Sequence, residues 1–363
     1  MKEATVSPAV DVIIATHNAR RPVERAARSV LDGWDPANGV VRVSVVCHNT
    51  DSGPIRERFG DELPPQVRFL ELRDDIPSPA GPFNYGLSQA TAPYVSIMGS
   101  DDWLEPGALR AWWEMAEARR SSAVIPRQIH ADGRIVRTPP IRLWRRGALN
   151  AVKDRLGYRT APLGLLRRSV VEDLGLAFSV GRRSGEDQEF STRLWFQGGR
   201  IDFAGRYGSY VVGDDATDRV TKDFRPLSED FAFVDGILRS EWFPRLSAVE
   251  QRSVAARIIR VQFFASVQAR VEGALWDDEA RDAAAATAEQ LISAVPAAMD
   301  IMSREDATAF SLIRHRAEDG DLRIVLSRRR RFGTPGTLFT SNPAKLLAPD
   351  APLRFMAASL LLR

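Results

Sequence analysis

Residues 10–18 read VDVIIATHN, an apolar run rich in β-branched residues that stops at three polar ones. A short apolar run of this kind is typical of a buried strand. After Pro22, apolar residues recur with the spacing of one helix face, at Val23, Ala26, Ala27, Val30 and Leu31. A strand followed at once by an amphipathic helix predicts a βαβ unit and therefore a mostly parallel sheet.

The same alternation continues as far as residue 98. Further apolar runs over residues 41–47, 67–72 and 94–98 predict three more strands. Polar segments follow three of the four strands: THN at 16–18, HNTDSG at 48–53 and SDD at 100–102. Open parallel sheets bind ligands at the carboxyl ends of their strands, so we expect a binding site at this edge.

The second part of the chain has a different character. After about residue 226, long helical patterns replace the strand and helix alternation. Two capping-box patterns, Ser169 with Glu172 and Ser247 with Glu250, predict helix starts. The length of 363 residues predicts two or three domains, and 44% hydrophobic with 27% charged residues is typical of a soluble globular protein. The change of pattern places an α/β domain at residues 1–225 and a helical domain at 226–363.

Composition excludes several classes of function. The net charge is +3, and 46 of the 50 cationic residues are arginine because only four are lysine (50 − 4 = 46). No element interleaves basic and aromatic residues, which argues against nucleic-acid binding. One cysteine excludes an intramolecular disulfide and a CxxC zinc site, and four scattered histidines disfavour a metal cluster, so we expect oxygen ligands for any bound metal.

Other absences narrow the interpretation further. No GxGxxG follows the first strand, which disfavours a dinucleotide-dependent oxidoreductase. The first residues lack the order of a secretory signal, and no stretch approaches 18 consecutive apolar residues. We therefore expect a cytoplasmic protein.

Two acidic pairs are candidates for chemistry. Asp101 and Asp102 follow an apolar strand, and Glu186 and Asp187 open a helix in the segment GEDQEF. Carboxylates at a strand end suit Mg²⁺ or Mn²⁺. Each pair has a structural alternative, since the first could cap the helix expected near Glu105 and the second could favour a helix dipole.

The ordered set ATHN, CHNTDSG, PFNYG, GSDD and GED resembles the motifs of family 2 glycosyltransferases over roughly residues 9–222. The resemblance implies a GT-A fold for residues 1–225, with a helical C-terminal domain. It implies an enzyme that transfers a sugar from a nucleotide diphosphate to an acceptor hydroxyl and inverts the configuration at the anomeric carbon. UDP is the leading nucleotide. The acceptor implied is a cell-surface glycan or a teichoic-acid-like polyol phosphate.

The resemblance also implies residue roles. Asp187 matches the general base, with Glu186 in support, and Mn²⁺ or Mg²⁺ would bind Asp101 with Asp102 adjacent. Asp214 or Asp215 would take the place of a histidine ligand found in many relatives. Donor-binding positions match a wider set: Thr16, His17, Asn18, His48, Arg73, Asn84, Ser100 and Asp101.

Besides the missing histidine ligand, two positions depart from the family pattern. The first acid of the DxD motif is Gly99, and the acid usual at the second strand end is Cys47 or His48, depending on register. These departures keep open a second hypothesis, a binding or scaffolding module that has the fold without the chemistry.

The C-terminal third carries no motif that we can connect to chemistry. The run Arg328–Arg331 and the segment 354–363 are interpreted as a solvated surface and a packed helix. The alternative is a peripheral contact with anionic lipid at the inner face of the membrane. Some members of the family use such extensions to form oligomers or to bind acceptors, so a homo-oligomer is a further expectation.

Overall fold

The protein forms two compact units. The computed structural model describes residues 8–182, 184–214, 225–317 and 319–361. Unit 1 comprises Met1–Val136, Arg146–Leu149 and Ala161–Lys222, and unit 2 comprises Arg137–Arg145, Asn150–Thr160 and Asp223–Arg363. Unit 2 therefore takes two segments that precede the expected boundary at residues 225 and 226.

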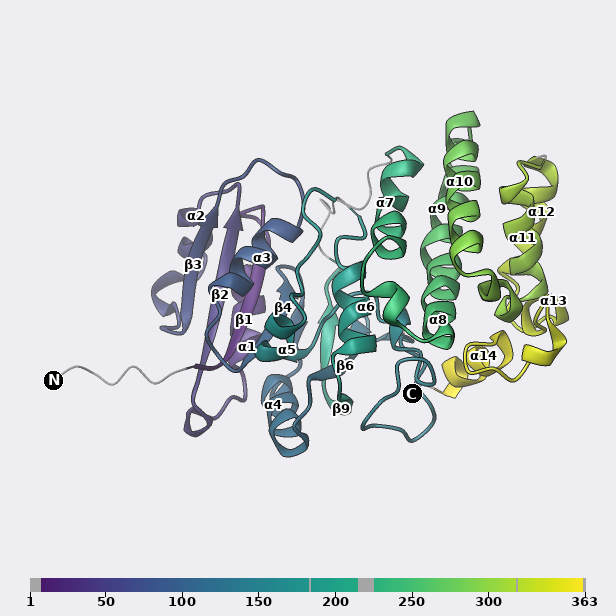
Figure 1. Cartoon of the computed structure of the whole chain (residues 1–363). Helices are drawn as coiled ribbons and strands as arrows, with labels where there is room; N and C mark the ends of the chain where they lie inside the picture. Colours follow the sequence, from purple (N-terminus) through teal and green to yellow (C-terminus); the bar gives the residue numbers. More distant parts are fainter. Residues whose placement is uncertain (1–7, 183, 215–224, 318, 362–363) are drawn as a thin grey trace. The chain divides into compact units, whose positions relative to one another are not determined.

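Unit 1 is built on a mixed sheet, whose strand order is β3-β2-β1-β4-β8-β6-β9-β5, with β7 paired to β6. Strands β3, β2, β1 and β4 are parallel and lie side by side (Figure 1). Strand β9 is parallel to β6, whereas β5, β7 and β8 pair antiparallel with their neighbours. The strands are β1 (Pro8–Thr16), β2 (Val40–His48), β3 (Val67–Leu72), β4 (Tyr94–Gly99), β5 (Trp103–Leu104), β6 (Ala123–His130), β7 (Ile135–Val136), β8 (Leu165–Arg167) and β9 (Ile201–Val212).

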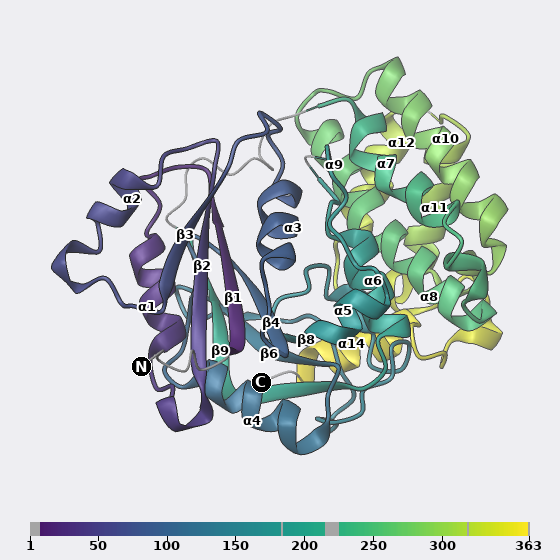
Figure 2. The same ribbon diagram turned by 60° about the vertical axis from the view of Figure 1, so that its left-hand side comes forward.

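Helices cover the sheet of unit 1 (Figure 2). They are α1 (Val23–Leu31), α2 (Gly53–Glu57), α3 (Ala80–Ser88), α4 (Ala108–Arg119), α5 (Arg168–Asp173) and α6 (Gln188–Gln197). The capping box expected at Ser169 is wrong: β8 runs directly into α5, so Ser169 lies inside the helix and Arg167 is the N-cap.

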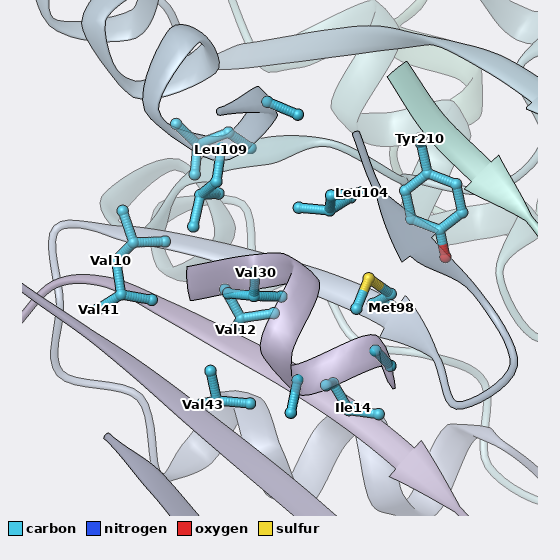
Figure 3. Packing of buried hydrophobic residues seen from close by; sticks show 14 of the residues in the cluster. Val10, Val12, Ile14, Val30, Val41, Val43, Met98, Leu104, Leu109 and Tyr210 are labelled. Carbon is cyan, nitrogen blue, oxygen red and sulfur yellow. The ribbon is translucent and has the colours of Figure 1, made fainter. Parts of the chain in front are cut away.

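Both faces of β1 are buried, which explains why its apolar run is nearly continuous. Side chains of a strand alternate between the two faces. Val12 and Ile14 belong to a core cluster with residues of α1 and α4, and Figure 3 shows them beside Val30. Ile13 points to the opposite face, where it contacts α3.

Unit 2 is helical. Its helices include α7 (Leu227–Leu238), α8 (Ala248–Ile258), α9 (Phe264–Glu272), α10 (Asp278–Ala294), α11 (Arg304–Arg314), α12 (Asp319–Arg329), α13 (Pro335–Leu338) and α14 (Pro352–Leu361). The capping box at Ser247 and Glu250 is confirmed at the start of α8. A π-helical turn, Ile259–Phe263, joins α8 to α9. Among the helices that the structure describes, none has the length and apolarity to cross a membrane.

The early segments are held in unit 2 by Tyr158. Its ring packs 4.7 Å from that of Phe355 in α14, and its hydroxyl accepts a hydrogen bond of 2.9 Å from Arg260. Within the arginine run, Arg329 is half-buried, and its Nε donates a hydrogen bond of 2.6 Å to Asp306. Membrane contact and oligomer formation by this unit stay predictions.

Gly86 sets the closeness of α3 to the sheet. A Cβ atom at this position would lie 2.3 Å from Cγ2 of Ile13, which is fully buried. We predict that Gly86→Ala lowers the free energy of unfolding by about 1–3 kcal/mol, because the overpacked core must shift. Urea denaturation measures this loss.

The matched control is Gly53→Ala at the start of α2. No atom lies within 4 Å of the Cβ that alanine would add there. We expect this variant to be neutral or slightly stabilising, by up to about 1 kcal/mol. Equal stability of the two variants would contradict the proposed close packing.

Candidate functional site

The parallel register brings the polar segments to one edge of the sheet. Thr16, the last residue of β1, pairs with Cys47 of β2, and Ala15 pairs with Gly99 at the end of β4. His48 pairs with Leu72 at the end of β3. The four strands point the same way, so the residues that follow each of them lie at the edge expected from the sequence.

The turn after β1 is closed by its own side chains. The Thr16 hydroxyl donates to the Asn18 carbonyl over 3.1 Å, and Asn18 Oδ1 accepts the Arg20 N–H at 2.9 Å. This local pattern is how asparagine stabilises a turn. It leaves His17 exposed and Arg21 buried. Asn18 therefore shapes the loop whether or not it also binds the donor.

Asp101 is tied to that turn by an ion pair. Arg21 Nη1 lies 3.2 Å from Asp101 Oδ1, and both residues are buried, as is Ser100. Arg25, one helical turn beyond Arg21, donates from Nη2 to the backbone carbonyl of Asp101. The pair joins the end of β1 to the end of β4 through charge.

Asp102 is held by β9. Its Oδ2 accepts from the Tyr210 hydroxyl, and its Oδ1 accepts from the Gly213 N–H at 2.8 Å. The same hydroxyl accepts the Gly99 N–H at 3.1 Å. Burial, followed by the charge of Asp102, raises the pKa of Tyr210 well above its usual value, so the phenol stays a donor. The labelled Tyr210 lies beside Met98 of β4 in Figure 3.

The residues at this edge fit a divalent ion through one carboxylate. A Cβ atom at Gly99 would lie 2.6 Å from Asp102 Oδ2, so an acid at this position would require the Asp102 carboxylate to shift. Both oxygens of Asp102 accept bonds from the protein, and Oδ1 of Asp101 lies beside Arg21. We take Asp101 as the candidate oxygen ligand. Mg²⁺ commonly uses one or two carboxylates together with substrate phosphates.

The remaining metal candidates are Asp214 and Asp215. Among the described residues, no group of three or more His, Cys, Asp or Glu side chains could hold a metal ion. Asp214 is exposed, and Asp215 lies outside the described residues. Their roles stay predictions.

The end of β2 has a histidine in place of an acid. His48 Nε2 lies 2.7 Å from Asp74 Oδ1, and Asn49 Oδ1 accepts the Asp74 N–H at 3.0 Å. Burial raises the pKa of Asp74, but hydrogen bonds from the Ile76 N–H and from His48 outweigh it, so the net pKa is lowered. Asp74 therefore stays a carboxylate facing His48.

The register left open by the sequence is decided at this strand end. Cys47 is fully buried in the core cluster, and burial raises the pKa of its thiol to about 12. His48 is thus the residue of the pair that reaches the polar edge. Arg73 follows β3 and is paired with Asp51 in an exposed position.

A second set of contacts positions the acids near α6. The Asn84 side chain donates to the Phe178 carbonyl over 2.9 Å and accepts its N–H at 2.8 Å. The Glu186 carbonyl accepts the Ser179 N–H at 2.9 Å. Asp187 is the N-cap residue of α6, and its Oδ1 accepts from Gln188 Nε2 at 2.9 Å. Asn84 thus fixes the loop that leads to Asp187.

Three residues of the site were missed by sequence reasoning: Arg21, Asp74 and Tyr210. Arg21 and Arg25 stand four apart directly after THN, a spacing that could have indicated a pair of cations on one helix face. Tyr210 carries no local signal, because its partner Asp102 is 108 residues away.

Known proteins resemble this chain over the same region. Residues 11–175 match the family model described as Glycosyl transferase family 2. Poly(ribitol-phosphate) beta-N-acetylglucosaminyltransferase TarP of Staphylococcus aureus is 24% identical over 57% of this chain and 63% of its own length. Succinoglycan biosynthesis protein ExoU of Rhizobium meliloti is 27% identical over 53% of this chain and 58% of its own. The chain thus spans about six-tenths of the length of each.

The fold also has a solved counterpart. The crystal structure of S. aureus TarS 1-349 in complex with UDP-GlcNAc superposes with a TM-score of 0.71 at 18% identity, covering 88% of this chain and 91% of that one. The GT-A fold expected from the sequence is confirmed, including a helical C-terminal region.

The Tyr210 hydroxyl is predicted to support the site through Asp102. In Tyr210→Phe, the Gly99 N–H and the Asp102 carboxylate both lose a partner, so we expect a loss of about 1–3 kcal/mol in unfolding free energy. Chemical denaturation provides the measurement. Tyr207→Phe on the same strand, where the ring is 47% exposed, should stay within about 0.5 kcal/mol of the parent. A Tyr210→Phe protein as stable as this control would refute the role.

Proposed function

We propose, from the premise that residues 11–175 form a glycosyl transferase family 2 domain, that the protein transfers a sugar from a nucleotide diphosphate to an acceptor hydroxyl. One observation carries the proposal for this chain: the buried ion pair of Arg21 with Asp101 joins the turn after β1 to the end of β4. Charged groups meet there at the edge where a nucleotide is expected to bind.

UDP is the proposed nucleotide of the donor. The solved TarS structure is described as a complex with UDP-GlcNAc, which supports this choice. The exposed His17 offers a ring face for a base, and Thr16 and Asn18 form the turn beside it. His48, backed by Asp74, offers polar ring atoms where relatives have an acid. Arg73 and Ser100 complete the proposed donor site.

Asp101 would hold Mn²⁺ or Mg²⁺. When bound, such an ion supplies positive charge that stabilises the departing diphosphate. The buried carboxylate of Asp101 is the donor of the right hardness, and Asp102 would act by fixing the strand end through Tyr210.

Asp187 is proposed as the general base. The acceptor oxygen attacks the anomeric carbon while the bond from that carbon to the diphosphate oxygen breaks, and the electron pair leaves with the nucleotide. The acceptor proton passes to the Asp187 carboxylate. Gln188 and the Glu186 backbone hold this residue at the start of α6. Direct displacement inverts the anomeric configuration.

The proposed acceptor is a polyol phosphate or a related surface glycan. The names of TarP, a poly(ribitol-phosphate) beta-N-acetylglucosaminyltransferase, and of ExoU, a succinoglycan biosynthesis protein, support this range.

Nucleotide binding is tested by thermal unfolding with UDP, GDP, dTDP and CDP, each with and without Mn²⁺. We expect UDP to stabilise the protein by about 2.7 kcal/mol at a hundred times its dissociation constant, because it binds the folded state alone. Asp101→Asn should lose most of the Mn²⁺-dependent gain, whereas Asp132→Asn, in an exposed hairpin turn, should keep it. A flat response across the panel would favour the non-catalytic module.

The role of Asp187 is tested by Asp187→Asn. We expect transfer to fall by about 10²–10⁴-fold, since the amide cannot take the proton, while UDP affinity stays near that of the parent. Radiolabelled sugar transfer and calorimetry measure the two quantities. Asp173→Asn, an exposed position in α5, is the matched control. An Asp187→Asn enzyme with full activity would remove this residue from the mechanism.

A further inference from the structure

Arg21 stands beside the carboxylate that is proposed to bind the metal. Its Nη1 is 3.2 Å from Asp101 Oδ1, and the two side chains are 9% and 12% exposed. A carboxylate so deeply buried requires a cation or hydrogen-bond donors. The chain itself therefore provides a positive charge at the point where a divalent ion would be expected to bind.

The backbone around Arg21 is fixed on both sides. Its N–H donates to the Asn18 carbonyl at 3.1 Å, and its carbonyl accepts the Val23 N–H at 2.8 Å. Pro22, whose ring restricts its φ, lies between Arg21 and Val23. These backbone bonds hold the turn that places the Arg21 side chain beside Asp101.

The two nearby arginines, Arg25 and Arg20, make different contacts. Arg25 donates to the backbone carbonyl of Asp101, and its guanidinium lies 4.2 Å from the centre of the Trp103 ring. Arg20 is exposed, with its N–H donated to Asn18. Arg21 differs from Arg20 in that its guanidinium is buried and lies 3.2 Å from the Asp101 carboxylate.

The second carboxylate of the edge is committed elsewhere. Asp102 accepts bonds from Tyr210 and Gly213, and position 99 is a glycine, which has no carboxylate to offer. A divalent ion and a guanidinium on the same carboxylate would repel each other, strongly so in a buried setting. The usual arrangement of two acids sharing one ion is therefore replaced by one acid already paired with an arginine.

We infer that Arg21 competes with the divalent ion for Asp101, and that it keeps the site able to bind a nucleotide diphosphate when no metal is present. The inference rests on the proposed function in taking Asp101 as the metal-binding carboxylate. With Arg21 in place, the negative charge of Asp101 is neutralised and does not repel the diphosphate. Without Arg21, that charge is exposed to the nucleotide and only a metal ion offsets it.

The first test uses Mn²⁺ alone on the nucleotide-free protein, with free Mn²⁺ measured by electron paramagnetic resonance. Arg21→Gln should bind Mn²⁺ about tenfold more tightly than the parent, since it removes a repelling charge. Arg21→Lys, which keeps the charge, should resemble the parent. Arg20→Gln makes the same change of net charge at the adjacent exposed position and should shift affinity by less than about twofold.

The second test measures UDP binding by calorimetry, in EDTA and in Mn²⁺. The parent should lose less than about fivefold in affinity when Mn²⁺ is replaced by EDTA, because Arg21 still neutralises Asp101. In EDTA, the UDP affinity of Arg21→Gln should fall by a factor at least about tenfold larger than that of the parent. Mn²⁺ should restore most of this affinity. Thermal unfolding of each variant establishes that it is folded.

Several results would overturn the inference. They are equal Mn²⁺ affinity in Arg21→Gln and the parent, no Mn²⁺ binding by either, or complete loss of UDP binding by the parent in EDTA. The last needs no variant, so the inference stays testable even where Arg21→Gln fails to fold. UDP binding that survives in Mn²⁺ keeps the proposed transferase function in each of these cases, whereas no UDP binding under any condition removes both.

Discussion

The parallel pairing of β1 with β2 and with β4 is the constraint on which the site depends. Parallel strands must share one direction, so their carboxyl ends meet at one edge. This register pairs Thr16 with Cys47 and Ala15 with Gly99. The turn that carries Arg21 and the strand end that carries Asp101 are thereby brought within reach of an ion pair, although 80 residues separate them in the chain (101 − 21 = 80).

Arginine pairing with buried carboxylates recurs in both units. In unit 1, Asp11 forms an ion pair with Arg42 at 2.6 Å, and Asp202 forms one with Arg200 at 2.8 Å. In unit 2, Asp154 takes Arg142 over 2.7 Å. Each of these carboxylates is nearly or fully buried, a state that a charge tolerates only when it is paired and hydrogen-bonded. Part of the arginine content therefore neutralises buried carboxylates within the fold.

At position 99 and at the end of β2, which depart from the family pattern, a neighbouring carboxylate lies close by. At position 99, the space that an acid would fill is occupied by the carboxylate of Asp102, which β9 holds in place. At the end of β2, the histidine is set against the carboxylate of Asp74, so an acid is still present one strand away. Although the family's acids are missing at these two positions, the carboxylates of Asp102 and Asp74 provide negative charge nearby.

The sequence by itself determined the four parallel strands β1 to β4, helices such as α1 and α8, and the edge of the sheet where the polar segments meet. Those features depend on residues close together in the chain, such as the apolar run of β1 and the capping box of Ser247, so local periodicity is enough to find them. Capping at Ser169 failed because the adjoining strand, not the motif, decided where the helix begins. Only the tertiary structure decided that Arg21 pairs with Asp101, that Tyr210 holds Asp102, and that Tyr158 packs with α14. Such contacts join residues far apart in the sequence, and their partners follow from the packing of whole elements, which no local pattern encodes.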